Sequence, residues 1–205
     1  MNKPWLKIIG ISESAPLDMS EASLSFIAQA DFVFGGKRHL KLLGIEETGL
    51  EWPIPFAIEQ LLEKRNRNVV VLASGDPFWF GVGGTIARHL SPSEWICIPG
   101  PSTFSLAASR LGWKLEDSIS LGLHNSPIET LINFAYKDQQ LIILCKDADA
   151  VKKIQKWFLD NKFSDSEFWV MEKLGGPSER VRKVSIKENN KYRIQTPVAV
   201  AIKVK

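Results

Sequence analysis

Four short apolar runs in the first half of the chain limit its possible folds more than any other feature. They span Leu6–Ile11, Phe32–Phe34, Val69–Ala73 and Trp95–Ile98. Each has the length of a strand and lacks the alternation of polar and apolar residues typical of a sheet with one face in water. Helix-like segments separate the runs, and Ser20 can cap one that begins at Glu21. The pattern predicts a parallel sheet covered by helices on both faces.

The second half has a different pattern. We expect a strand, a helix and three further strands at Gln140–Cys145, Ala148–Leu159, Phe168–Met171, Arg180–Ile186 and Pro197–Val204. No helix separates the last two strands, so the polar turn at 187–191 predicts that they form an antiparallel pair. We therefore predict an α/β fold of two lobes. The first, with a parallel sheet, spans residues 1–118, and the second, with a mixed sheet, spans residues 119–205.

Composition excludes several classes of function. The net charge of +3 is too small for a nucleic-acid-binding protein, which usually carries a dense basic stripe. The N-terminal residues lack a signal-peptide pattern, and the longest apolar runs are shorter than a membrane span. We therefore expect a cytoplasmic protein that binds neither nucleic acid nor membrane. Cys97 and Cys145 lie inside apolar runs, which predicts buried thiols, and we expect no protein-bound metal.

Three polar loops contain the candidate site residues: Ser74–Pro77, Pro99–Thr103 and Ser120–Pro127. In an open α/β sheet, the loops at the carboxyl ends of the strands face the ligand crevice. Asp76 would present a carboxylate there, although Gly, Asp and Pro are equally the residues of an ordinary turn. The segment Gly81–Gly84 lacks the third glycine of a dinucleotide-binding loop and is only a weak indication of that function.

Six segments resemble the tetrapyrrole methylase family, and their order along nearly the whole chain is that of the family. They are Ile8–Ile11, Ala30–Leu40, Leu72–Pro77, Ile98–Thr103, Arg110–Trp113 and Met171–Arg180. Within the family, Gly35-Gly-Lys-Arg-His-Leu40 and the Leu-Gly-Gly-Pro element at 174–177 are typical of the C5-methylating precorrin enzymes. The chain departs from the family where Ser12 and Ala15 replace glycines, and it lacks an arginine after His124.

The resemblance implies that S-adenosylmethionine binds in a cleft between the two lobes and leaves as S-adenosylhomocysteine. It implies these cofactor-binding residues: Gly10, Ser74, Gly75, Asp76, Trp79, Ser102, Thr103, Leu144, Cys145, Leu174 and Gly175. We expect Asp76 to be the catalytic or active-site carboxylate. The carboxylate arms of a corrin precursor require polar partners, for which we expect Lys37, Arg38, His39, His124 and Arg180. We expect Lys41, Arg182 and Lys183 to be solvated surface charges.

The implied reaction is methylation of C5 of a precorrin or a cobalt-precorrin in vitamin B12 biosynthesis. We expect a homodimer that binds this small tetrapyrrole substrate. Methylation at C15 and decarboxylation would then belong to a separate protein or to a further C-terminal domain. Two alternatives remain. One is another methyltransferase of the same fold, acting on diphthine or on ribosomal RNA, and the other is a module that binds a nucleotide or a tetrapyrrole without catalysis.

Overall fold

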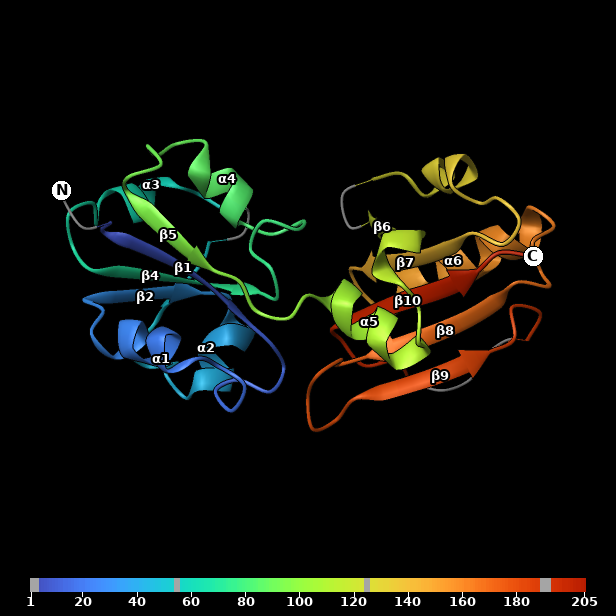
Figure 1. The fold of residues 1–205 in the computed structure, drawn as a ribbon, viewed down its shortest axis with the longest axis horizontal. Helices are drawn as coiled ribbons and strands as arrows, with labels where there is room; N and C mark the ends of the chain where they lie inside the picture. The colour runs from blue at the N-terminus through green and yellow to red at the C-terminus, as the bar shows by residue number, and fades with distance from the viewer. Residues whose placement is uncertain (1–3, 54–55, 124–125, 189–192) are drawn as a thin grey trace. The chain divides into compact units, whose positions relative to one another are not determined.

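The computed structural model describes residues 4–53, 56–123, 126–188 and 193–205. The chain divides into two compact units, residues 1–102 and 103–205, and each is described by itself (Figure 1). The division differs from the expected boundary after residue 118. Helix α5 (Thr103–Leu111) belongs to the second unit because Phe104 and Ala107 pack against Ile142 and Ala201 of that unit's sheet.

The first unit contains a parallel sheet of five strands in the order β3-β2-β4-β1-β5. Its strands are β1 (Leu6–Ile11), β2 (Phe32–Gly35), β3 (Leu50–Glu51), β4 (Val69–Ser74) and β5 (Trp95–Ile98). Its helices are α1 (Glu21–Ala28), α2 (Lys37–Leu43), α3 (Glu59–Leu62) and α4 (Gly83–Ala87). The Ser20 hydroxyl accepts a hydrogen bond from the backbone N–H of Ser23, as the predicted cap requires.

Both faces of this sheet are buried, which explains why the strand sequences do not alternate. Leu6 and Val69 lie on the face covered by α3 and α4, while Ile9 and Val70 lie on the face covered by α1 and α2. Figure 1 shows the two pairs of helices on opposite sides of the sheet. The predicted parallel sheet is confirmed, and the carboxyl ends of β1, β2, β4 and β5 share one edge.

The second unit contains a mixed sheet of five strands in the order β6-β7-β10-β8-β9. Its strands are β6 (Ser118–Gly122), β7 (Gln140–Cys145), β8 (Glu167–Glu172), β9 (Arg180–Val184) and β10 (Val198–Lys203). Helix α6 (Ala148–Asp160) covers one face and α5 the other, and the 3-10 helices η1 (Leu115–Asp117) and η2 (Ile128–Asn133) flank β6 in the chain. Figure 1 shows α5 in front of this sheet and α6 behind it.

The predicted pairing of the last two strands is wrong. β10 lies between β7 and β8 and is antiparallel to both, whereas β9 pairs with β8 at the edge. The difference follows from burial, because every side chain from Val198 to Ile202 is buried and only a central strand covers all of them. Among the described residues, no helix has both the length and the apolar character needed to cross a membrane.

Candidate functional site

Three glycines bring together the loops that follow β1, β4 and β5. A Cβ atom built on Gly10 would lie 1.8 Å from the Gly75 carbonyl oxygen and 2.4 Å from the Gly100 nitrogen. The Gly100 N–H donates to the Gly75 carbonyl at 3.0 Å, and the Gly75 N–H donates to the Ile11 carbonyl at 2.8 Å. The three loops therefore form a single tight junction at the carboxyl edge of the sheet, where the sequence predicted a ligand site.

Gly75 also has a structural role at this junction. Its φ is +55°, and a Cβ there would lie 3.0 Å from the Pro101 carbonyl oxygen and 3.1 Å from Ser102 Cα. The close approach that this glycine permits is therefore to the neighbouring loop of the same unit. Gly10 has the same function at the junction, and the Ser102 side chain is buried close to it.

Ser74, at the end of β4, connects two groups of residues that the sequence suggested separately. Its Oγ accepts a hydrogen bond from an Arg38 NH2 group at 2.6 Å and lies 2.9 Å from His39 Nε2. Arg38 also contacts His39 Nε2 at 3.0 Å and forms an ion pair with Glu13. A predicted cofactor residue and two predicted substrate residues therefore form one network.

Sequence reasoning missed Glu13, the anion in this network. It lies in the loop after β1, where Ser12 replaces an expected glycine. The Ser12 hydroxyl donates to the Asp18 carboxylate and accepts a hydrogen bond from the Ser14 N–H at 2.8 Å. The substitution thus gives the loop internal hydrogen bonds, and Ala15, which replaces the other glycine, is buried against Leu40. The available signal was the position of Glu13, a carboxylate in the loop directly after a buried strand.

Burial and the neighbouring Arg38 cation lower the pKa of His39 to about 4. The imidazole is consequently neutral at physiological pH and can accept a hydrogen bond. Lys37, the residue before Arg38, is exposed at the start of α2. A cationic donor, Arg38, and a neutral imidazole, His39, therefore both contact the hydroxyl of the exposed Ser74.

Asp76 forms the turn after Ser74. Its Oδ1 accepts a hydrogen bond from the Phe78 N–H at 2.8 Å, which is the contact of the ordinary turn considered above. The side chain is nevertheless partly exposed, so the contact does not prevent it from meeting a ligand. Burial, and secondarily the Asp76 charge, raise the pKa of the Cys97 thiol to about 11.

In the second unit, two of the predicted cofactor residues lie on opposite faces of the sheet. Leu144 packs on the side of α5 with Ile142, whereas Cys145 packs on the side of α6 with Ile143. The side chains of Leu144 and Cys145 therefore cannot both face a ligand that lies on one face of the sheet. Burial raises the pKa of Cys145 to about 12.

An ion pair fixes the loop that contains Leu174 and Gly175. Arg110, at the end of α5, donates to both carboxylate oxygens of Glu179 at 2.5 and 3.0 Å. Glu179 also accepts a hydrogen bond from the Gly175 N–H at 2.6 Å. Gly175 has a φ of +82°, and Leu174 is buried under α5. Two of the segments that resemble the family are thus in direct contact through Arg110 and Glu179.

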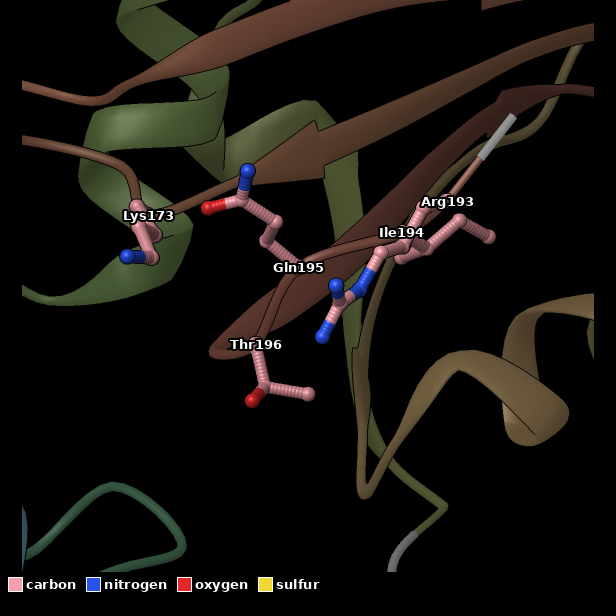
Figure 2. Close-up of a pocket in the computed structure, with 5 residues that line it drawn as sticks. All are labelled: Lys173, Arg193, Ile194, Gln195 and Thr196. Carbon is pink, nitrogen blue, oxygen red and sulfur yellow. The ribbon is translucent and has the colours of Figure 1, made fainter.

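A cavity of about 440 Å³ lies beside this loop. Figure 2 shows its lining, which consists of Lys173, Arg193, Ile194, Gln195 and Thr196. Two cations, an amide and a hydroxyl give the cavity a polar, positively charged character. Its volume lies within the range typical of small-molecule sites.

A buried carboxylate supports one wall of this cavity. Glu172 is 1% exposed, accepts a hydrogen bond from the Gln195 N–H at 2.5 Å and forms an ion pair with Arg182. The expectation that Arg182 is a solvated surface charge is therefore wrong, because a buried anion needs a paired cation. The same expectation for Lys183 is only partly met, since its ammonium contacts Glu167 at 2.8 Å and lies over the Trp169 ring.

The remaining predicted residues lie outside the clusters described above. Arg180 is exposed at the start of β9. Thr103 begins α5, directly after the buried Ser102. His124 lies outside the described residues. Over the described parts of the chain, no group of three His, Cys, Asp or Glu side chains could hold a metal ion.

Residues 6–189 match a family model described as Tetrapyrrole (Corrin/Porphyrin) Methylases. The chain is 37% identical over 182 residues to a Sinorhizobium protein named precorrin-6Y C(5,15)-methyltransferase (decarboxylating). That match covers 87% of this chain and 44% of the relative, so the chain spans less than half of the relative's length.

A Salmonella typhimurium relative, named cobalt-precorrin-7 C(5)-methyltransferase, is 31% identical over 115 residues, covering 55% of this chain and 57% of that protein. The fold is also similar to a solved structure from Archaeoglobus fulgidus, named cobalamin biosynthesis precorrin-6Y methylase (cbiE). The TM-score is 0.69 and the identity 20%, with 98% of each chain covered.

Proposed function

Because the chain belongs to the tetrapyrrole (corrin/porphyrin) methylases, we propose that it transfers a methyl group from S-adenosylmethionine to C5 of a precorrin or a cobalt-precorrin. The observation that carries the proposal is the family match over residues 6–189, together with relatives whose names specify precorrin methylation. The C5 position is favoured by the Salmonella typhimurium relative, which is named for C5 alone.

We propose cofactor-binding residues within each unit, taken separately. In the first unit, we assign to it the edge formed by Gly10, Ser74, Asp76 and Trp79, where the glycine junction fixes the loops and the Ser74 hydroxyl is exposed. The exposed Trp79 indole suits a cationic sulfonium, because aromatic faces attract cations.

In the second unit, the cavity beside Leu174 and Gly175 fits the adenosine part in size and chemistry. The Gln195 amide and the Thr196 hydroxyl offer donors and acceptors to a base and a ribose. We include Ser102, Thr103 and either Leu144 or Cys145 as further cofactor contacts on the basis of the resemblance.

The carboxylate arms of the substrate explain the choice of cationic residues. The planar guanidinium of Arg38 can bind a carboxylate with two hydrogen bonds, and Lys37, the preceding residue, adds a second positive charge. We retain His39, His124 and Arg180 in the proposed substrate site. Asp76 remains the proposed active-site carboxylate.

The reaction makes limited demands on side chains. S-adenosylmethionine supplies a methyl group on a good leaving group, and the electron-rich ring supplies the carbon nucleophile. Holding two reactants in line can contribute about 7–11 kcal/mol to lowering a barrier. The glycine junction and the Glu13–Arg38–Ser74 contacts supply the rigidity that such positioning requires.

The test is a product analysis. Purified chain, S-adenosylmethionine and the reduced precorrin precursor are incubated, the product mass is recorded, and the methylated carbon is located by NMR. One added methyl at C5 with all carboxyl groups retained is the expected result. Two added methyls with loss of carbon dioxide would contradict it, because we propose that C15 methylation and decarboxylation need a separate protein or a further domain. Binding without turnover would instead support a non-catalytic module.

We also propose that the functional species is a homodimer. Light scattering at the assay concentration should give twice the chain mass of 23.0 kDa. A monomer that is fully active would contradict this part of the proposal.

A further inference from the structure

Glu172 holds one wall of the polar cavity in the second unit without lining that cavity. The described residues that line it are Lys173 and residues 193–196, and they do not include Glu172. One carboxylate oxygen of Glu172 accepts the hydrogen bond from the Gln195 N–H at 2.5 Å, and the other oxygen pairs with Arg182. Both oxygens are therefore in use, and the segment that leads into β10 is connected through Glu172 to β8 and β9.

Stability alone does not account for this buried carboxylate. Glu172 is 1% exposed and ends a strand in which Val170 and Met171 are buried apolar residues. Replacing a buried ion pair by apolar side chains of similar volume is often neutral or stabilising. The place in which the carboxylate holds the Gln195 backbone is therefore the better explanation for a charged pair at this position.

Backbone contacts fix the Lys173 side of the same cavity. The Lys173 N–H donates to the Pro197 carbonyl at 2.8 Å, and the Lys173 carbonyl accepts from the Gly176 N–H at 3.0 Å. The φ of Lys173 is +48°, a conformation that is uncommon for a residue with a side chain and that clusters at functional sites. The backbone on both sides of the cavity is thus held by contacts within the second unit.

The polar side chains of the cavity are available to a ligand. Among the described residues, the Gln195 amide, the Lys173 ammonium and the Thr196 hydroxyl make no hydrogen bond to the protein. Figure 2 shows the Gln195 side chain extending toward Lys173, whereas Thr196 points the other way. An amide carries an acceptor and two donors, and a glutamine amide can pair with the amino group and the N7 nitrogen of adenine at the same time.

We propose that Glu172 is a positioning residue for the cofactor, which acts by holding Gln195 so that its side-chain amide pairs with the adenine base. The inference rests on the proposed function, which assigns the adenosine part to this cavity, and adds to it the residue that sets the cofactor affinity from outside the cavity. The Gln195 oxygen accepts from the adenine amino group, and its NH2 group donates to N7. Glu172 itself contacts no atom of the ligand.

The experiment measures the binding of S-adenosylhomocysteine, which contains the adenosine part, to the full chain by isothermal titration calorimetry. An amide has one acceptor oxygen, so the new side chain in Glu172→Gln can serve Arg182 or the Gln195 N–H but not both. The charged guanidinium makes the stronger hydrogen bond, so the Gln195 contact should be lost. We expect Glu172→Gln to weaken binding about fivefold and Gln195→Ala about tenfold, the second of which corresponds to about 1.4 kcal/mol.

The double variant separates positioning from a general structural contribution. If Glu172 acts through the Gln195 amide, adding Glu172→Gln to Gln195→Ala should change the affinity by less than about twofold, because the two effects are not additive. Equal weakening by Glu172→Gln in both backgrounds would show that Glu172 contributes only to structure, and the inference would be wrong. Unchanged affinity of Glu172→Gln alone would also overturn the inference, while leaving the proposed function intact.

Glu167→Gln is the matched control. Glu167 begins β8 and, like Glu172, forms an ion pair with a residue of β9, Lys183, at 2.8 Å. It does not line the cavity and is not bonded to the segment that does. Its variant should bind S-adenosylhomocysteine as the unmodified chain does, and a loss as large as that of Glu172→Gln would contradict a specific role for Glu172.

Two outcomes concern the protein as a whole. Failure of the unmodified chain to bind S-adenosylhomocysteine would overturn the proposed cofactor and the inference with it. If circular dichroism shows that Glu172→Gln is misfolded, Glu172→Met combined with Arg182→Met takes its place in the same measurements. That variant removes the buried ion pair as a whole and leaves no acceptor at residue 172 for the Gln195 N–H.

Discussion

The neutral His39 gives the first unit a specific dependence of stability on pH. Its folded-state pKa of about 4 lies below the ordinary value of 6.5, because burial and Arg38 disfavour the charged imidazole. As the pH falls below 6.5, the unfolded chain takes up this proton first. The contribution of His39 to stability is therefore fully present above pH 6.5 and is lost as the pH falls toward 4.

The size of the effect follows from the two pKa values. Each unit of difference is worth about 1.36 kcal/mol, so the full loss is about 3 kcal/mol. About 1.4 kcal/mol of it should already be lost at pH 5.5. The assay is urea unfolding of the wild-type chain and of His39→Gln between pH 7.5 and pH 4.5. Comparing the two removes the contribution of carboxylates that titrate in the same range.

The control is His89→Gln, at an exposed position on the surface of the first unit. The wild-type chain and His89→Gln should lose stability in parallel as the pH falls, while His39→Gln should lose less. If His39→Gln follows the wild-type curve within about 0.5 kcal/mol at every pH, His39 is not held neutral by its surroundings and the reasoning is refuted.

Three further predictions concern packing, charge and thiol reactivity. Gly10→Ala should destabilise the chain by more than about 4 kcal/mol in urea unfolding, since no room exists for the Cβ, whereas Gly84→Ala, with open space in a helix, should stabilise it by about 0.5–1 kcal/mol. Arg182→Met should cost about 3–5 kcal/mol by leaving a buried glutamate without its paired cation, and a cost near zero would contradict that pairing. Cys97 and Cys145 should resist iodoacetamide at pH 8 until urea is added, because their raised pKa values leave little thiolate, and rapid labelling of the native chain would contradict this.

The parallel class of the first sheet was predictable from local sequence, because burial on two faces removes the alternation of residue types. The place of β10 was not predictable in this way. The apolar run at 197–204 identifies a strand but does not identify its partners. These are β7 and β8, whereas proximity in the chain suggested pairing with β9. β6 was read as part of a loop, since Ser118-Ile-Ser-Leu-Gly is only half-buried at the sheet edge.

Site residues within one continuous segment were predictable from sequence. Ion pairs between residues far apart in the sequence were not. The turn around Asp76 was found from its residue types. The contact of Arg38 with Glu13 joins helix α2 to the loop after β1, and no local pattern encodes it. Arg182 was misjudged for the same reason, because its charge looks solvated until the buried partner Glu172 is known.

The central position of β10 has a consequence for synthesis on the ribosome. The first unit is complete in sequence by residue 102, so its sheet can form while the rest of the chain is still being made. The second sheet cannot close until residues 198–203 have left the exit tunnel, because β7 and β8 meet only through that strand. Until then, β7 and β8 each present an unpaired edge, which is the kind of surface that favours aggregation.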